Sequence, residues 1–355
     1  MTATAPLRAR DLGLPFPGTP GPWNAITDVP GIAVGFTTLT DPARNIRTGV
    51  TAILPRPGRE ARPVAAGQAT LNGNGEMTGT HWINDAGYFL GPVCITNTHS
   101  IGAVHHGATR WMIDTYAEHF SGPAWAMPVV AETYDGILND INAMAVTPDH
   151  AIAALHAAAS GPVAEGSTGG GNGMIAYEFK AGTGTASRRV RLAGGEFTLG
   201  VLVQANHGIR KWLNILGKPV GQMIPEGAWR SADLGSIIVV VATDAPLSPL
   251  ALRHVARRAG LGVARGGTPG GNSSGDIFLA FSTADIGPMP QKAGPRIARE
   301  EINMETLDPL YLATVEAVEE AVVNALVAGE DVPAFRPTGR MVPGLGAERL
   351  RRIFA

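Results

Sequence analysis

Short apolar runs separated by turn residues dominate the chain, and most of them have the length of one β-strand. The longest strongly apolar run covers Ile237–Ala242. Continuous apolar runs are typical of strands that are covered on both faces. Strands are therefore predicted at Ile32–Phe36, Val50–Leu54, Val93–Thr96, Val129–Glu132, Leu199–Gln204, Ser236–Thr243 and Ile277–Ser282.

Helical periodicity appears between these runs. Helices are predicted at Ile101–His119, Pro148–Ala159, Leu247–Gly260 and Asp308–Ala328, the last with Asp308 as its cap and Pro309 at its first position. Strands and helices mix without a strict strand–helix–strand alternation, which favours an α+β layered architecture over a doubly wound parallel sheet. No charged or Ser-rich linker divides the sequence, so residues 1–355 are predicted to form a single domain.

Charge and composition narrow the possible partners. The 355 residues include 28 Lys or Arg and 30 Asp or Glu, and this near-neutral balance gives a nucleic acid no electrostatic reason to bind. No window reaches the roughly 18 consecutive apolar residues of a membrane span. Only 16% of the residues are charged, against 45% that are hydrophobic. Apolar surface is therefore expected to be hidden in a subunit interface.

Two further features limit the chemistry. The single cysteine, Cys94, excludes disulfides and multi-cysteine metal sites and is expected to be a buried, inert thiol. His99, His105 and His106 lack metal-binding spacing, so neither a metal nor a cofactor is predicted. The first ten residues carry basic side chains with no apolar stretch behind them, which favours a cytoplasmic location over secretion.

Glycine gathers in two similar loops, Gly166–Met174 and Arg265–Asp276. Neither fits a phosphate-binding or dinucleotide-binding motif, so both are first interpreted as flexible turns. In the second loop, however, Ser273 and Ser274 run directly into the predicted strand Ile277–Ser282. A serine at the head of a core strand, behind small residues, is suited to a precursor that cuts itself. The hydroxyl attacks the preceding carbonyl, and the freed α-amine later serves as the base.

The segment Gly271-Asn-Ser-Ser-Gly-Asp-Ile-Phe-Leu-Ala-Phe-Ser-Thr resembles the cleavage segment of the DmpA-like aminopeptidases. This family contains L-aminopeptidase D-amidase/D-esterase and the β-peptidyl aminopeptidases. The resemblance extends over most of the chain through Ile26-Thr-Asp-Val-Pro-Gly-Ile-Ala-Val-Gly, Gly75-Glu-Met-Thr-Gly, Ile95-Thr-Asn-Thr-His-Ser-Ile-Gly, Glu132-Thr-Tyr-Asp-Gly, Val203-Gln-Ala-Asn and Ile237-Ile-Val-Val-Val-Ala-Thr-Asp-Ala-Pro-Leu.

This resemblance implies a four-layer αββα sandwich similar to the N-terminal-nucleophile hydrolases. It also implies autocleavage into an α chain, 1–273, and a β chain, 274–355, that stay associated in a homo-oligomer, with a tetramer suggested. The implied nucleophile is Ser274, with Ser273 as an alternative. Tyr134 and Asn206 match the family's oxyanion donors, which stabilise a developing alkoxide.

Two assignments are less direct. The family's Ser-x-Glu pair near the nucleophile matches Thr314 and Glu316, although positions two apart point in different directions on the predicted helix. Glu319 and Glu320 are then expected on its solvated face. A free substrate ammonium calls for a carboxylate, and Glu132 is the first candidate, with Glu76 behind it.

The expected activity is release of N-terminal residues from short peptides, amides or esters, through an acyl-enzyme on the serine. L-α, D-α and β-amino acyl groups all stay open as substrates. The alternatives are an amide-oligomer hydrolase of the same processed type and an unprocessed small-molecule binding protein.

Overall fold

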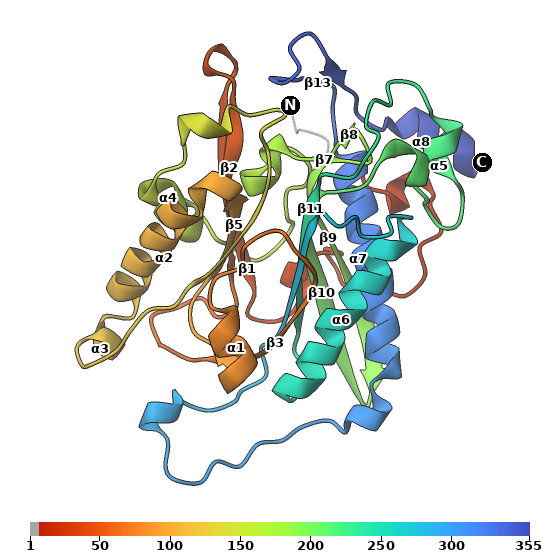
Figure 1. Ribbon diagram of the computed structural model, residues 1–355. Coiled ribbons are helices and arrows are strands. Elements are labelled where there is room, and N and C mark those ends of the chain that lie inside the picture. Colours follow the sequence, from red (N-terminus) through yellow and green to blue (C-terminus); the bar gives the residue numbers. More distant parts are fainter. Residues whose placement is uncertain (1–6) are drawn as a thin grey trace, which may run out of the picture.

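The computed structural model describes residues 7–355, and the chain folds into four layers, helices–sheet–sheet–helices (Figure 1). The predicted αββα sandwich is confirmed. The first sheet has the strand order β1-β2-β5-β6. Its strands are β1 Ala33–Asp41, β2 Ile46–Leu54, β5 Val93–Asn97 and β6 Val129–Thr133.

The second sheet is larger, with the order β4-β3-β12-β11-β10-β9. Its strands are β3 Val64–Gly73, β4 Tyr88–Phe89, β9 Gly182–Leu192, β10 Gly195–Asn206, β11 Ser236–Thr243 and β12 Gly275–Ser282. The central strands β11 and β12 run parallel, and their other neighbours run antiparallel to them. Both central strands therefore begin at the same edge of the sheet.

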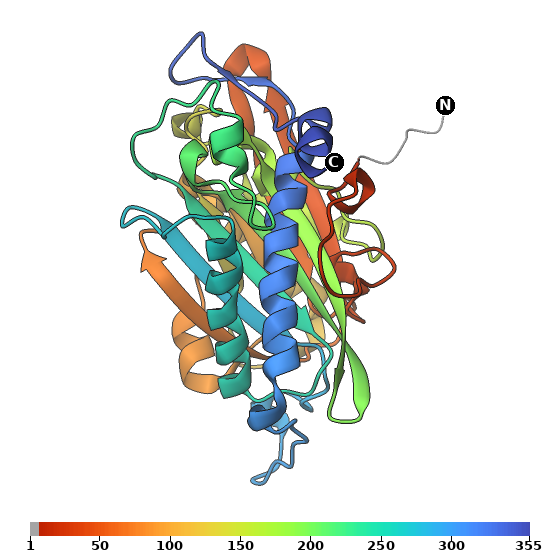
Figure 2. The same ribbon diagram turned by 90° about the vertical axis from the view of Figure 1, so that its right-hand side faces the viewer.

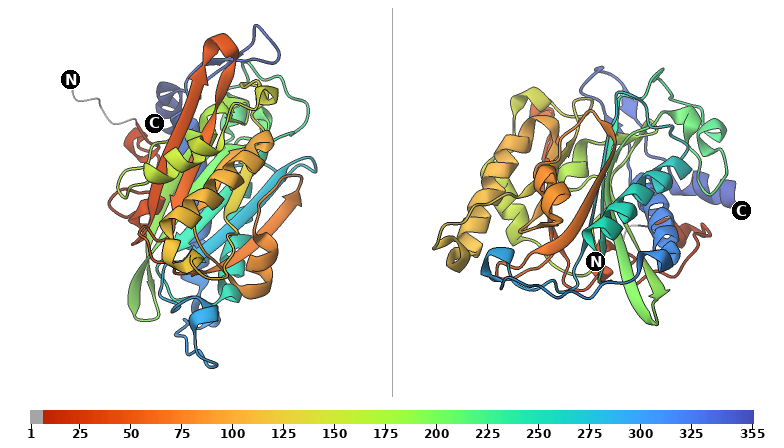
Figure 3. Two further views of the ribbon diagram at one scale, coloured as in Figure 1. Left: turned by 90° about the vertical axis from the view of Figure 1, so that its left-hand side faces the viewer. Right: turned by 60° about the horizontal axis from the view of Figure 1, so that its bottom comes forward.

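Helices cover the outer face of each sheet. α2 Ile101–Thr115 and α4 Pro148–His156 lie over the first sheet (Figure 3), while α6 Pro249–Arg265 and α7 Asp308–Val327 lie side by side over the second (Figure 2). The remaining elements are α1 Thr80–Ala86, α3 Ala117–Phe120, α5 Val220–Met223, α8 Ala347–Phe354 and the short ladders β7 Ile175–Ala176 with β8 Phe179–Lys180 and β13 Val332–Pro333 with β14 Met341–Val342.

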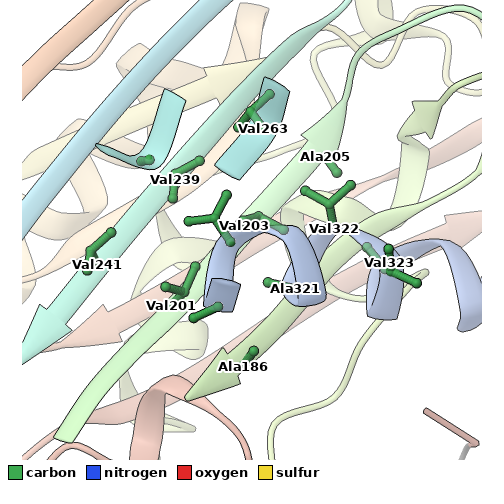
Figure 4. Close-up of a cluster of buried hydrophobic side chains, with 14 of the residues drawn as sticks. Ala186, Val201, Val203, Ala205, Val239, Val241, Val263, Ala321, Val322 and Val323 are labelled. Carbon is green, nitrogen blue, oxygen red and sulfur yellow. The ribbon is translucent and has the colours of Figure 1, made fainter. Parts of the chain in front are cut away.

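Three apolar layers hold the sandwich together. One lies between the two sheets, and one lies under α2 and α4. The third fills the space between the second sheet and α6 and α7, where valines of β10 and β11 meet Ala321, Val322 and Val323 of α7 (Figure 4). β11 is buried along its whole length because it carries side chains into both neighbouring layers. This explains why its sequence is continuously apolar.

Helix ends differ from the sequence prediction in several places. The helix predicted at Ile101–His119 breaks at Tyr116, between α2 and α3. The α6 helix begins at Pro249, where the Ser248 hydroxyl accepts from the Ala251 N–H, and it runs on to Arg265. Asp308 is the first residue of α7 and not its cap, since the capping position belongs to Leu307.

Two polar segments that were expected at the surface are buried. The glycine run of the first loop forms a short 3-10 helix, Gly169–Gly173, that is wholly buried against the first sheet and β9. It is a packed element rather than a flexible turn. Glu319 and Glu320 of α7 are also buried, and the Glu320 carboxylate accepts hydrogen bonds from Arg10, Asn24 and Arg188.

Candidate active site

Ser274 ends the second glycine loop, directly before β12, and is buried. Its hydroxyl donates to Asp276 Oδ1 at 2.5 Å, and Asn72 Nδ2 donates to the other oxygen of that carboxylate at 3.0 Å. Ser273 is exposed, and its carbonyl accepts from Asn74 Nδ2 at 2.7 Å. The loop that precedes Ser274 is therefore held against the end of β3 and the residues after it.

Tyr134 and Asn206 lie together, as their predicted shared role requires. Tyr134 follows β6 and is half-exposed, and Asn206 is the last residue of β10. The Asn206 side chain donates to the Tyr134 carbonyl at 2.8 Å and accepts from the Ile175 N–H at 2.9 Å. These contacts fix the amide, and one of its two N–H groups stays available to a substrate oxygen.

Strand register shows which residue lies next to Asn206. In the antiparallel pair β10–β11, Asn206 is opposite Ser236, the first residue of β11. In the parallel pair β11–β12, Ser236 is opposite Gly275, and the Gly275 N–H donates to the Ser236 hydroxyl at 3.3 Å. Ser236 thus lies between the predicted oxyanion donor and the Ser274 loop.

Ser236 is not among the site residues predicted from the sequence. It nevertheless has the feature used for Ser274, a serine that follows a small residue and precedes a core strand. Gly235 and Ser236 stand directly before the longest apolar run, Ile237–Ala242. A Cβ at Gly235 would lie 1.9 Å from the Asn206 carbonyl oxygen, so this position accepts only glycine. The N–H of Gly235 donates to Asp233 Oδ1 at 3.1 Å, which fixes the turn before the serine.

Glu132 is a buried carboxylate at the same edge of the sandwich. Its Oε1 accepts from the Glu76 N–H at 3.0 Å, and its Oε2 accepts from the Thr98 hydroxyl. Burial raises the pKa of Glu132, while these two hydrogen bonds oppose the shift. A Cβ added to Gly75 would be 3.0 Å from Glu132 Oε1 and 3.4 Å from the Gly275 Cα. Glu132 therefore lies beside the start of β12, whereas the Glu76 side chain is exposed.

The structure does not bring Thr314 and Glu316 to Ser274. Both belong to α7, on the outer face of the second sheet over β9 and β10. The Thr314 hydroxyl donates to the Leu310 carbonyl at 2.8 Å, and Glu316 forms an ion pair with Arg188 at 3.5 Å. In these positions they cannot orient the hydroxyl of Ser274. The carboxylate that does so is Asp276.

His207, the residue after Asn206, is fully buried, and neither of its ring nitrogens has a hydrogen-bond partner. Its ring contacts Tyr177 edge-on, with 5.0 Å between the centroids. Burial lowers the pKa of His207, and the nearby carboxylates of Asp233 and Asp276 oppose that shift.

No group of His, Cys, Asp and Glu residues with metal-binding geometry occurs within residues 7–355. Cys94 is fully buried, and burial raises the pKa of its thiol to about 12, which agrees with the expected inert thiol. Across the same residues, no helix is long and apolar enough to cross a membrane.

Comparisons with known proteins agree over almost the whole chain. The profile of peptidase family S58 matches residues 24–339. The β-peptidyl aminopeptidase of Sphingosinicella microcystinivorans is 49% identical, covering 98% of this chain and 91% of its own length, and that of Sphingosinicella xenopeptidilytica is 45% identical, covering 99% and 93%.

Solved structures show the same relationship. One is the L-aminopeptidase D-Ala-esterase/amidase of Ochrobactrum anthropi, described as a prototype for the serine aminopeptidases and a new variant of the Ntn hydrolase fold. It superimposes with a TM-score of 0.93 at 56% identity, over 98% of each chain. A Burkholderia sp. β-aminopeptidase gives a TM-score of 0.89 at 46% identity, over 97% of each chain.

Proposed function

This chain belongs to peptidase family S58, and we propose that it is a self-processing aminopeptidase whose nucleophile is a serine freed as a new N-terminus. Peptidase relatives at 45% and 49% identity favour a hydrolase over an unprocessed binding protein. The observation that supports the proposed site most directly is the register that puts Asn206 opposite Ser236.

Two serines are candidates for the nucleophile. Neighbouring strands lie about 4.8 Å apart, so Ser274, on the far side of β11 from Asn206, is roughly 10 Å from it. A hydrogen bond needs about 3 Å, and Asn206 therefore cannot stabilise an oxyanion formed on Ser274. Ser236 is one strand from Asn206. We therefore propose Ser236 as the nucleophile and Ser274 as its neighbour, held by Asp276.

Self-cleavage then takes place between Gly235 and Ser236. The Ser236 hydroxyl attacks the Gly235 carbonyl carbon, the C–N bond breaks, and the peptide becomes an ester with a free Ser236 amine. Water hydrolyses the ester and leaves a Gly235 carboxylate. The products are chains of 235 and 120 residues, whereas cleavage before Ser274 gives 273 and 82.

Turnover uses the same groups. The Ser236 α-amine, with an ordinary pKa near 8, takes the hydroxyl proton as Oγ attacks the substrate carbonyl, and then returns it to the leaving amine. Asn206 and Tyr134 donate to the oxyanion. Glu132 pairs with the free ammonium of the substrate, because it is a buried carboxylate beside Gly275, the residue opposite Ser236. The nearby Asp276, in contrast, already accepts from the Ser274 hydroxyl.

Sequencing the N-terminus of the smaller fragment tests the assignment. We expect Ser-Ile-Ile-Val-Val-Val, and an N-terminus of Ser-Gly-Asp-Ile-Phe-Leu would restore Ser274 as the nucleophile. The Ser236→Ala variant should remain one band on a denaturing gel and be inactive. The matched Ser274→Ala variant should still be cut, more slowly. A single full-length band from active protein rules out self-processing altogether.

The substrate class needs its own assay. The relatives are named for β-peptidyl, L-aminoacyl and D-alanyl substrates, so a panel of L-α, D-α and β-aminoacyl p-nitroanilides is the direct comparison. An amide-oligomer hydrolase of the same processed type is the alternative. It would accept N-acetylated substrates as well as free amines, whereas an aminopeptidase requires the free amine. The homo-oligomer and the cytoplasmic location stay predictions.

A further inference from the structure

A cavity of about 280 Å³ opens at the end of the sandwich opposite the candidate active site. Its walls come from α1, β4, α2, α3 and the short 3-10 helix Pro290–Lys292, which gather at the lower left of Figure 1. β4 pairs with the first residues of β3, whereas the candidate active site is near the last ones. At about 3.3 Å per residue, the ten residues of β3 put roughly 30 Å between the cavity and the Ser274 loop. Glu132 is nearer, because Gly79 in the cavity wall packs against Val129, which is three residues and roughly 10 Å from Glu132 along β6.

The inner wall of the cavity is apolar and rich in aromatic rings. Tyr88, Phe89 and Met112 are buried, and Trp82 meets the Tyr88 ring edge-on with 5.6 Å between centroids. Trp125 stands at the mouth and is 59% exposed. Apolar and aromatic walls are typical of small-molecule sites. The volumes of such sites begin at about 300 Å³, slightly above the volume of this cavity. The aromatic edges and the thioether favour a flat ring as the guest.

The titratable side chains that line the cavity are both basic, Lys292 and His119. Burial lowers the pKa of His119, and the nearby Lys292 lowers it further. Within residues 7–355, the buried His119 Nδ1 has no hydrogen-bond partner, and no Asp or Glu lines the cavity. A guest with a carboxylate finds a cation there, whereas a guest ammonium finds no counter-charge.

We propose that this cavity binds a small aromatic carboxylate that lacks a free amine, with the ring against Trp82 and Tyr88 and the carboxylate toward Lys292. The cavity shares no lining residue with the candidate active site, and the proposal does not rest on the proposed peptidase mechanism. A free aromatic amino acid is excluded because its ammonium would be unpaired beside a lysine.

Calorimetric titration of the intact protein with indole-3-propionate tests the proposal. We expect saturable one-to-one binding, and at least tenfold weaker binding of tryptamine, which has the same ring and the opposite charge. Lys292→Met should weaken the carboxylate at least tenfold and leave indole-3-propionamide unchanged. The matched control is Lys218→Met, before α5, where the ammonium donates to the Ile353 carbonyl of α8, and it should change nothing.

Three outcomes overturn the proposal. The first is no binding of either probe, and the second is equal binding of carboxylate and amine. The third is a cavity that a second copy of the chain fills. In that case the carboxylate would bind only after Trp125→Lys has broken up the oligomer. Ser236→Ala and Ser274→Ala should bind indole-3-propionate like the unaltered protein. Loss of peptidase activity is therefore distinguishable from loss of this site.

Discussion

Glu132 is the residue that we propose pairs with the substrate ammonium, and this pairing would separate an aminopeptidase from a general amidase. It is buried, and two donors, the Glu76 N–H and the Thr98 hydroxyl, hold its carboxylate beside Gly75 and Gly275. A charge-assisted hydrogen bond contributes roughly 1.5–3 kcal/mol. Loss of this contact should therefore lower activity on substrates with a free amine relative to N-acetylated substrates.

We expect Glu132→Gln to lower kcat/KM about 10- to 100-fold on substrates with a free amine. The measurement is an aminoacyl p-nitroanilide assay, run beside the N-acetylated analogue. The exposed Glu76 supplies the matched control, and Glu76→Gln should keep nearly full activity. Reversed results for the two variants would make Glu76 the ammonium partner.

Asp135, the residue after Tyr134, provides a test by pH. Burial raises the pKa of Asp135 to about 7, although Asn139 Nδ2 donates to it at 3.0 Å. The unfolded chain releases this proton near pH 4, while the folded chain keeps it to about pH 7. The stability that the proton confers is therefore complete below about pH 4 and is lost as the pH rises toward 7.

Asp135→Asn should remove that pH dependence. Between pH 4.5 and 6.5 the free energy of unfolding of the unaltered protein should fall relative to the variant by about 1.4 kcal/mol per pH unit. Urea unfolding at several pH values measures this difference. Staying below pH 6.5 keeps Lys180, whose pKa burial lowers to about 7, mostly protonated. If the free energy of unfolding changes equally with pH in the two proteins, the raised pKa of Asp135 is contradicted.

At the scale of elements, α7 is joined to the second sheet by a buried ion-pair cluster. The Arg188 side chain of β9 is 1% exposed and contacts the carboxylates of Glu320 at 2.7 Å and Glu316 at 3.5 Å. Arg10, in the N-terminal segment, pairs with Glu320 at 2.8 Å. The cluster therefore connects three parts of the chain that are distant in sequence.

Removing Arg188 leaves the buried Glu320 with Arg10 as its remaining cation and takes the cation away from Glu316. Arg188→Met should therefore destabilise the protein by up to roughly 3–5 kcal/mol, the range for a broken buried ion pair. The neighbouring Arg189 pairs with Glu196 at the surface, and Arg189→Met should change stability by about 1 kcal/mol or less. Denaturant unfolding measures the loss of stability in each variant. Equal losses in the two variants would contradict a special role for the buried cluster.

At the scale of the whole molecule, the low charge content predicts an oligomer. Several large apolar side chains stay exposed on the single chain, among them Trp23, Leu234 and Leu312. A folded homo-oligomer, with a tetramer suggested by the family resemblance, would cover part of this surface.

Light scattering coupled to size-exclusion chromatography measures the oligomer directly. We expect a mass near four times 36.9 kDa, unchanged by self-cleavage because both chains share one core. A mass of one chain at micromolar concentration would refute the oligomer and leave the apolar surface without its proposed cover.

The sequence by itself determined the strands, the helices and the family. Apolar periodicity is a local property, and β11 and α7 are visible in it because burial on one or both faces dictates residue type. The fold then followed from the resemblance, and in the structure Asn206 donates to the carbonyl of Tyr134, which follows Glu132 by two residues.

Only the tertiary structure decided which serine faces Asn206 and which carboxylates are near it. Ser236 and Ser274 share the same local signal, a small residue and a serine before a core strand, so spacing could not separate them. Strand order and register separate them, because they fix distances across the sheet. The same long-range packing carries Glu316 to Arg188, away from the site, whereas the contact between Ser274 and Asp276 is local because the two residues are two positions apart.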